Sequence, residues 1–486
     1  MNTIKITIGL LSLITALLSF DSIATNIFSN EKEIVFKSGD QSVVAYEGSI
    51  QVLENRNNKD SRTIPLTYVR FPATGTTKGS PIVYLSGGPG GSGISTAQYP
   101  NFRFPLFMAL REFGDVIALD QRGTGKSRIV PRCESKQSLP LNERLSEIYV
   151  TTVYRAAAQE CADFWEKEGA DLLGYTSVQS AHDLNDLRKH LNAEKLTLWG
   201  ISYGSHLALT SLKVMENHID KMVLASAEGL NQTVKLPAQT DAYFNRLQQA
   251  INQQPKAKIA YPDIISLIKR VNQKLDANPI ALTVPQKEGE AIEFLFQKRH
   301  LQAIASRTIA DPHRYVSMLL QIYSGIDNGI TAMLPSTIER AGLMNTKISF
   351  DIMSFGMDIA SGVTDERLAQ IEQQASDSLL GKALNFPMPH LNKVIPTLDL
   401  GDDFRSRPVS EVPTLLLSGS LDGRTYMSSQ YEATAGLTNL TKVTVKNAGH
   451  NLFMVSPKVT EAIKKFLADK PIDDEEIEFT LPPFVE

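Results

Sequence analysis

The residues best suited to covalent chemistry in this 486-residue chain are a serine in a glycine-flanked turn and two partners near the C-terminus. The segment Gly200–Gly204 reads Gly-Ile-Ser-Tyr-Gly, directly after the apolar run Lys195–Trp199 and before a helix-compatible stretch. A strand-to-helix turn of this G-x-S-x-G kind exposes the serine hydroxyl at the edge of a sheet. Ser202 is therefore the predicted nucleophile.

The serine hydroxyl needs a base, which in such a site is a late histidine that follows an acid along the chain. His450, in Ala-Gly-His-Asn after a strand-like run, has the required position. Asp422 precedes it and follows the apolar run Thr414–Leu417. Its expected role is to hold the imidazole tautomer and stabilise the imidazolium. Asp402 and Asp403 are rivals, but no strand pattern precedes them.

An oxyanion hole would complete this site. One donor is expected to be the backbone N–H of Tyr203, the residue after the nucleophile. The other is expected from the glycine loop Gly87–Gly93, where the missing side chains let the backbone approach a substrate closely. Gly88 is the preferred donor in that loop. Asp120 and Arg122, after the next strand-like run, are expected to brace the loops around it.

The same loop supports a rival interpretation, since Gly88–Gly93 also matches the dinucleotide fingerprint G-x-G-x-x-G. A proline inside the motif, Pro89, and two in the region of the following helix, Pro100 and Pro105, oppose that interpretation. The chain holds neither H-E-x-x-H nor C-x-x-C. No metal ion and no other cofactor is therefore expected.

The elements that must position these residues alternate between short apolar runs and helical patterns. Residues 31–72 look like β structure, and further strand-like runs occur at 81–85, 115–119, 195–199, 221–225, 414–417 and 443–445. Runs of this kind indicate buried strands of a parallel sheet. Helical patterns between them predict an α/β fold, a mostly parallel sheet flanked by helices.

The strand rhythm stops between Glu228 and Val412, where the pattern is mainly helical. Because strand-like runs return afterwards, this stretch is predicted to be an inserted cap. The expected organisation is a core in two parts, 31–228 and 412–470, a helical cap at 229–411, and an acidic tail at 471–486.

Residues 1–24 read as a secretory signal. Lys5 precedes the apolar run Ile6–Phe20, which is short for a membrane span, and Ser22–Ala24 has a small–x–small cleavage pattern. The alternative is a retained N-terminal anchor. The mature protein is expected to be exported, to a periplasm or outside the cell, without stable membrane insertion.

Two cysteines, Cys133 and Cys161, are the only thiols. In an oxidising compartment they could form one disulfide; the alternative is two separate buried thiols. The net charge of −4 shows no basic footprint, so no nucleic-acid partner is expected.

The chain resembles the α/β-hydrolase superfamily, and one branch in particular. Ser86–Gly93 and Asp120–Ser127 look like the paired motifs of the prolyl iminopeptidase and tripeptidyl aminopeptidase family. That resemblance implies a secreted serine peptidase that releases N-terminal proline or short di- or tripeptides through an acyl-enzyme. It covers most of the predicted core and none of the cap. Ser86 is a departure, because many relatives have histidine there.

An aminopeptidase must recognise the ammonium group of a peptide with a free N-terminus. Glu228, at the end of the strand-like run before the cap, is the candidate anchor, and the alternative is a solvent-exposed loop glutamate. Acids in the cap are further candidates: Asp241, Asp311, Glu339 and Asp351. Two other functions stay open. One is a carboxylesterase or lipase-like enzyme with the same triad, and the other is a non-catalytic binding protein.

Overall fold

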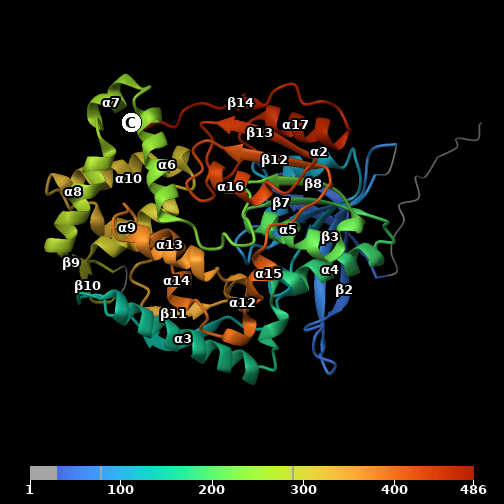
Figure 1. The fold of residues 1–486 in the computed structure, drawn as a ribbon, viewed down its shortest axis with the longest axis horizontal. Coiled ribbons are helices and arrows are strands. Elements are labelled where there is room, and N and C mark those ends of the chain that lie inside the picture. The colour runs from blue at the N-terminus through green and yellow to red at the C-terminus, as the bar shows by residue number, and fades with distance from the viewer. Residues whose placement is uncertain (1–29, 77–78, 287–288, 486) are drawn as a thin grey trace, which may run out of the picture.

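The computed structural model describes residues 30–76, 79–286 and 289–485 and divides the molecule into a sheet-centred part and a mainly helical part (Figure 1). The predicted signal at 1–24 lies outside the described residues. Within them, no helix combines the length and the apolar character that a membrane span requires.

A ten-stranded sheet forms the centre of the first part. The first three strands pair antiparallel with one another, and β3 pairs antiparallel with β5, whereas all later neighbours are parallel. The predicted α/β fold with a mostly parallel sheet is therefore confirmed. In spatial order the strands are β1 (Lys32–Ser38), β2 (Gln41–Leu53), β3 (Thr63–Phe71), β5 (Val116–Leu119), β4 (Ile82–Leu85), β7 (Leu196–Ile201), β8 (Ile219–Ala225), β12 (Thr414–Gly419), β13 (Leu440–Lys446) and β14 (Glu476–Glu478).

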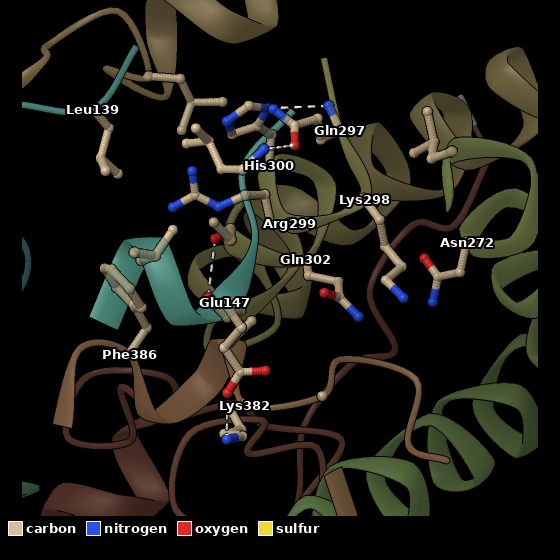
Figure 2. A pocket seen from close by; sticks show the side chains of 18 of the residues that line it. Leu139, Glu147, Asn272, Gln297, Lys298, Arg299, His300, Gln302, Lys382 and Phe386 are labelled. Carbon is tan, nitrogen blue, oxygen red and sulfur yellow. Dashed lines mark hydrogen bonds and ion pairs between the residues drawn. The ribbon is translucent and has the colours of Figure 1, made fainter. Parts of the chain in front are cut away.

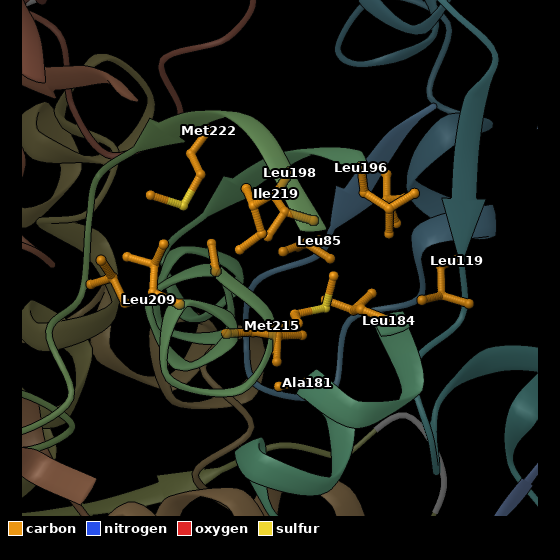
Figure 3. Close-up of a cluster of buried hydrophobic side chains, with 14 of the residues drawn as sticks. Leu85, Leu119, Ala181, Leu184, Leu196, Leu198, Leu209, Met215, Ile219 and Met222 are labelled. Atoms are coloured by element: carbon orange, nitrogen blue, oxygen red, sulfur yellow. The ribbon is translucent and has the colours of Figure 1, made fainter. Parts of the chain in front are cut away.

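Helices cover both faces of this sheet, which is why its central strands are buried along their whole length. On β7, Leu198 points to the face covered by α4 (Ser177–His190) and α5 (Tyr203–Met215), where Figure 3 shows it. Its neighbour Trp199 points to the opposite face, covered by α2 (Phe104–Leu110) and α17 (Pro457–Leu467). Because the strands from β5 to β14 in spatial order are all parallel, their C-terminal ends lie at one edge of the sheet.

The chain between β8 and β12 forms most of the second part and has its own hydrophobic core. It contains a hairpin that the sequence did not indicate, β9 (Ile280–Val284) with β10 (Ile292–Phe296). Its helices are α6 (Pro237–Ile251), α7 (Pro255–Ala260), α8 (Ile264–Ala277), α9 (Lys298–Thr308), α10 (Pro312–Asp327), α11 (Leu334–Arg340), α12 (Ile352–Ser361), α13 (Asp365–Ala375), α14 (Met388–Leu391) and α15 (Gly401–Arg405).

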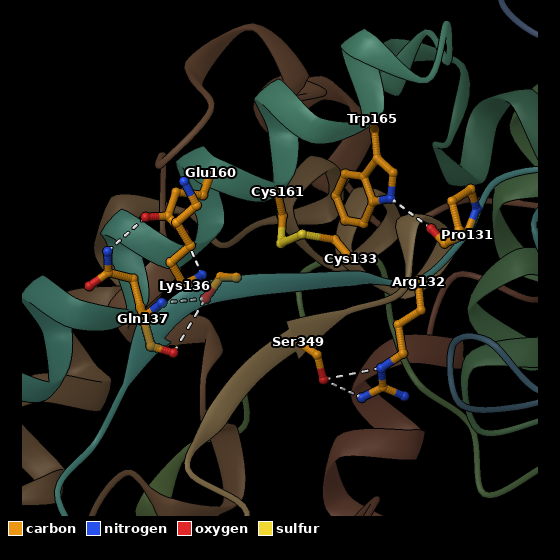
Figure 4. The surroundings of a disulfide bond; sticks show 10 residues. Pro131, Arg132, Cys133, Lys136, Gln137, Glu160, Cys161, Trp165 and Ser349 are labelled. Atoms are coloured by element: carbon orange, nitrogen blue, oxygen red, sulfur yellow. Dashed lines mark hydrogen bonds between the residues drawn. A yellow bond between two sulfur atoms is a disulfide. The ribbon is translucent and has the colours of Figure 1, made fainter.

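A segment between β5 and β7 of the core also packs against this second part. After β5, strand β6 (Cys133–Ser138) pairs antiparallel with β11 (Lys347–Phe350), and the long helix α3 (Glu147–Lys167) contacts α14. The predicted disulfide is present: Cys133 and Cys161 tie β6 to α3 (Figure 4). This segment therefore packs with the helical part, although the sequence analysis included it in the core at 31–228.

The tail after residue 470 is not only a solvated acidic run, because apolar side chains in it are buried against the rest of the protein. Strand β14 adds to the edge of the sheet next to β13. Its Ile477 is buried between two exposed glutamates, and Phe484 packs into the core of the helical part. The tail therefore connects the two parts.

Candidate active site

Ser202 stands at the turn between β7 and α5, with a φ of 54°. This left-handed conformation is unfavourable for a residue with a side chain, and such outliers cluster at active sites. The flanking glycines are required by close packing. A β-carbon at Gly200 would lie 2.6 Å from the Gly204 carbonyl oxygen, and one at Gly204 would lie 2.0 Å from that of Leu85. The turn presents the hydroxyl at the N-terminus of α5.

Asp422 and His450 meet beyond the ends of β12 and β13. Nδ1 of His450 lies 3.0 Å from Oδ2 and 3.2 Å from Oδ1 of Asp422. An ionised carboxylate only accepts hydrogen bonds, so Nδ1 is the donor and Nε2 keeps its lone pair. The structure therefore brings together the predicted base and acid in the geometry that base catalysis requires.

Asp422 stays ionised although it is fully buried. Burial alone would raise the pKa of Asp422, but the charge and hydrogen bond of His450 outweigh it and hold the pKa below its ordinary value. The backbone N–H groups of Arg424 and Thr425 donate to Oδ1 at 2.7 and 2.9 Å, and the Thr425 hydroxyl donates to Oδ2 at 2.8 Å. These contacts fix the carboxylate beneath the imidazole.

Ser226 connects the nucleophile turn with the histidine loop. The Ser202 N–H donates to the carbonyl of Ala225, at the end of β8, over 3.1 Å. The next residue, Ser226, donates its hydroxyl to the His450 carbonyl over 2.8 Å. Among the described residues, the Ser202 hydroxyl has no direct hydrogen bond to His450. Contacts of this kind often tighten only when substrate binds.

The glycine loop lies directly against the nucleophile. A β-carbon at Gly87 would come within 3.2 Å of Cβ of Ser202. Gly88 and Gly90 have φ of 129° and 109°, a region open to glycine and strained for other residues. The N–H of Tyr203 belongs to the first turn of α5, where amides lack partners within the helix. The roles of Gly88 and Tyr203 as oxyanion donors remain predictions.

Asp120 and Arg122 fasten the surrounding loops. Asp120 accepts from the Ser92 hydroxyl at 2.6 Å and from the backbone N–H groups of Ile94 and Lys126 at 3.1 and 2.8 Å. Arg122 donates to both carboxylate oxygens of Asp183, at 2.7 and 2.6 Å. Asp120 thus holds the end of the glycine loop, whereas Arg122 ties the turn after β5 to α4.

Glu228 lies close to the nucleophile turn, because its N–H donates to the Ser205 hydroxyl over 2.8 Å. Its carboxylate is buried and pairs with the ammonium of Lys235 at 2.7 Å. Burial alone would raise the pKa of Glu228, but Lys235 outweighs it and holds the pKa below its ordinary value. Glu228 is thus a buried ion-pair member instead of an exposed loop residue.

A second acid, Asp358 on α12, was not indicated by the sequence. Ser354, one turn earlier on the same helix face, lies 3.7 Å from the position that a Gly90 β-carbon would take. Burial, and then the negative charge of Glu228, raise the pKa of Asp358 to about 7. This carboxyl has no motif, and only the packing of α12 over the glycine loop identifies it.

Two of the cap acids named from the sequence are engaged elsewhere. Asp241 accepts a hydrogen bond from the Leu379 N–H at 3.0 Å, and Asp351 pairs with Arg128 at 2.9 Å. Asp311 immediately follows Ala310, whose carbonyl accepts the His450 N–H over 2.8 Å. Glu339 lies on α11.

Comparison with known families agrees with this architecture. A model of the alpha/beta hydrolase fold matches residues 80–279, which include Ser202, and a model of TAP-like proteins matches residues 396–478, which include Asp422 and His450. The first match continues through α8 of the helical insertion, and the second begins shortly before α15 at its end.

Named relatives match over shorter stretches. Serine protease Hip1 of Mycobacterium tuberculosis (strain CDC 1551 / Oshkosh) is 30% identical over 189 residues, 37% of this chain and 35% of the relative. Tripeptidyl aminopeptidase of Streptomyces coelicolor is 27% identical over 172 residues, 34% of this chain and 32% of the relative. The chain thus spans about a third of the length of these relatives. Among solved structures, the proline iminopeptidase-related protein of Thermus thermophilus is 16% identical, with a TM-score of 0.36 over 87% of this chain and 97% of that chain.

Proposed function

Because this chain is a member of the α/β-hydrolase superfamily, we propose that it is a serine aminopeptidase that removes proline or a short peptide from a free N-terminus. The observation that carries the proposal is the buried Asp422–His450 pair, with Nδ1 to Oδ2 at 3.0 Å, beside a serine held at a φ of 54°. The names of the relatives, a serine protease and a tripeptidyl aminopeptidase, support the choice of peptide bonds.

In the proposed reaction, the Ser202 oxygen attacks the scissile carbonyl carbon while Nε2 of His450 takes the hydroxyl proton. Asp422 stabilises the resulting imidazolium. The amides of Gly88 and Tyr203 bind the negative oxygen of the tetrahedral intermediate. The imidazolium then protonates the leaving amine, the C–N bond breaks, and an acyl-enzyme remains. Water, deprotonated by His450, releases the acyl group and regenerates Ser202.

The substrate ammonium would bind at the carboxyl pair formed by Glu228 and Asp358. Glu228 is already neutralised by Lys235, so Asp358 would supply most of the uncompensated negative charge. A protonated α-amine has a pKa of about 8. Ammonium and ionised Asp358 therefore coexist near neutral pH, which favours a charge-assisted hydrogen bond there.

Export belongs to the same proposal. The Cys133–Cys161 bridge supports an oxidising compartment, because disulfides persist there and are rare in the cytosol. Mass spectrometry of the purified mature chain would test it: a new N-terminus near residue 25 is expected, and an intact residue 1 would contradict it.

The activity is tested with two chromogenic peptides, Ala-Ala-Pro-p-nitroanilide with a free and with an acetylated N-terminus. Only the free form should be cleaved. Equal cleavage of both would contradict the ammonium site and indicate an endopeptidase or an esterase.

The nucleophile is tested separately. Ser202→Ala should lower kcat by about 10⁶, as expected when a triad member is removed. A loss below about tenfold would refute the proposed mechanism, whichever peptide is used.

A further inference from the structure

A large cavity lies inside the helical part of the molecule (Figure 2). Its volume is about 1380 Å³, and α3, α8, α9 and α13 contribute to its walls. Neither Ser202 nor His450 is among its described lining residues. The cavity is therefore distinct from the catalytic centre, and it exceeds the usual size of a small-molecule site.

Positive charge predominates in this cavity. Lysines and arginines outnumber aspartates and glutamates by eight to four among its lining residues. Most of the carboxylates are already paired: Glu147 and Glu372 with Lys382, and Asp276 with Lys298. The remaining excess of cations favours an anionic occupant.

Arg299 is one of the lining cations for which the described part of the chain provides no counter-ion. It lies near the start of α9, and Figure 2 shows its guanidinium among the side chains that line the cavity. Within the described residues it has neither a carboxylate partner nor a hydrogen bond. Burial lowers the pKa of Arg299, opposed only by the nearby phenol of Tyr154. A partly desolvated guanidinium without a counter-ion is unfavourable, which favours the binding of an anionic group at this position.

The surroundings of Arg299 supply further donors. Arg307 lies eight residues along α9, hence on the same face, and also lines the cavity. Tyr154, on α3, packs edge-on against Phe386 with ring centroids 4.7 Å apart. His300 contributes no positive charge, because burial lowers its pKa to about 3. Two guanidiniums and a phenol therefore face one space.

Arg424 connects the cavity to the catalytic centre. It lines the cavity, and its backbone N–H donates to Oδ1 of Asp422 over 2.7 Å. Through Arg424 the cavity adjoins the Asp422 loop, so a peptide that extended from Ser202 into the cavity would pass this residue.

We propose that this cavity binds a carboxylate of the peptide substrate, with Arg299 as its anchor, so that the protein selects peptides carrying an acidic side chain or a free C-terminus. Arginine forms paired hydrogen bonds with the two oxygens of a carboxylate, which explains why this position holds a guanidinium. This inference rests on the proposed peptidase function and adds the chemical class of its substrates.

Binding without turnover tests the inference. The full chain carrying Ser202→Ala is titrated calorimetrically with free-amino pentapeptides. One pair, Ala-Ala-Pro-Glu-Ala amide and its Gln counterpart, tests a side-chain carboxylate. A second pair, Ala-Ala-Pro-Ala-Ala as acid and as amide, tests the C-terminus. At least one acidic member should bind about tenfold more tightly than its neutral partner.

Adding Arg299→Gln should abolish that difference, and Arg299→Lys should restore part of it. Arg270→Gln is the matched control, because Arg270 is exposed on α8, pairs with Asp327 and does not line the cavity. Since Arg299→Gln removes an uncompensated charge, it should not lower the melting temperature of the ligand-free protein. The change in binding is then attributable to the cavity.

Equal binding of acidic and neutral peptides, or a preference that survives Arg299→Gln, would overturn the inference. The proposed function is judged separately, by cleavage with intact Ser202. Cleavage of free-amino peptides without any acid preference would leave the function standing and remove the inference. An acid preference without cleavage of any peptide would retain the carboxylate site and refute the peptidase.

Discussion

Two aspartates near the nucleophile illustrate how partners decide the charge of a carboxyl group. Asp422 is completely buried, but His450 and two backbone amides keep its pKa below the ordinary value. Asp358 has Glu228 as its charged neighbour, and its pKa rises to about 7. The first carboxyl group therefore stays ionised, as the proposed role of orienting His450 requires, whereas the second changes charge near neutrality.

This raised pKa of Asp358 predicts a dependence of stability on pH. Between about pH 4 and pH 7 the folded protein holds a proton on Asp358 that the unfolded chain has lost, so folding stability falls as pH rises. Asp358→Asn lacks this titration. It should match wild type at pH 5 and be more stable at pH 8, by on the order of 1 kcal/mol or more. Urea denaturation at the two pH values measures the difference in the free energy of unfolding. If this free energy fell equally in wild type and variant between pH 5 and pH 8, the raised pKa would not belong to Asp358.

The same titration should appear in substrate affinity. Below about pH 7 Asp358 is protonated and loses its attraction for the substrate ammonium. KM for the free-amino peptide should therefore rise as pH falls from 8 to 6, and Asp358→Asn should have a high KM throughout. A flat KM in wild type would exclude Asp358 from binding the amine.

The Glu228–Lys235 pair predicts strong coupling between two substitutions. Glu228→Gln leaves a buried ammonium without an anion, at a cost of about 3 kcal/mol or more. Lys235→Met leaves a buried carboxylate and should cost a similar amount. The double variant should recover most of the loss. Additive losses in chemical denaturation would show that the pair is not the determinant of stability here.

At the scale of elements, the nucleophile turn depends on contact between β4, β7 and α5. A methyl group at Gly204 would overlap the Leu85 carbonyl, so Gly204→Ala should lower stability by about 1–3 kcal/mol and displace Ser202. Activity should fall by much more than the folded fraction. Gly401→Ala is the control: its φ of 77° makes an alanine there strained, so stability should fall, but a β-carbon meets nothing within 4 Å and kcat should stay unchanged. Full activity of Gly204→Ala would contradict the packing described.

The elements that could be predicted from sequence are those whose signal is local. β4, β5, β7 and β12 are buried on both faces and read as continuous apolar runs. The serine, the acid and the histidine follow from a motif and from chain order. β9, β10 and β14 are short or half-exposed strands whose pairing depends on tertiary contacts. Lys235 and Asp358 carry no motif, because only the packing of remote segments brings them to the site.

At the scale of the whole molecule, the helical insertion is joined covalently to β8 and β12 of the core. It also contacts β6 and α3, which belong to the first core segment. The Cys133–Cys161 bridge holds these two elements together. α3 forms one wall of the cationic cavity, and β6 pairs with β11 of the insertion. The bridge therefore stabilises the wall of the cavity rather than the catalytic residues.

Replacing both cysteines with serine should lower the free energy of unfolding by about 3–4 kcal/mol in the chain-entropy account for a loop of this length. At 25 °C kcat for a neutral peptide should stay near wild type, because Ser202, Asp422 and His450 are untouched. Thermal unfolding with and without reductant measures the change, and the double-serine variant should not respond to reductant. Equal melting temperatures of variant and oxidised wild type would contradict this role.

The segment Ile309–Pro312 touches both catalytic loops at once. A β-carbon at Gly423 would lie 2.3 Å from the Ile309 carbonyl oxygen, one at Gly449 would lie 2.5 Å from the Pro312 ring, and Ala310 accepts the His450 N–H. Lifting this segment would release the histidine loop in the same motion. A substitution that displaced this segment would therefore shift the His450 imidazole relative to Asp422, and would lower activity without touching Ser202, Asp422 or His450.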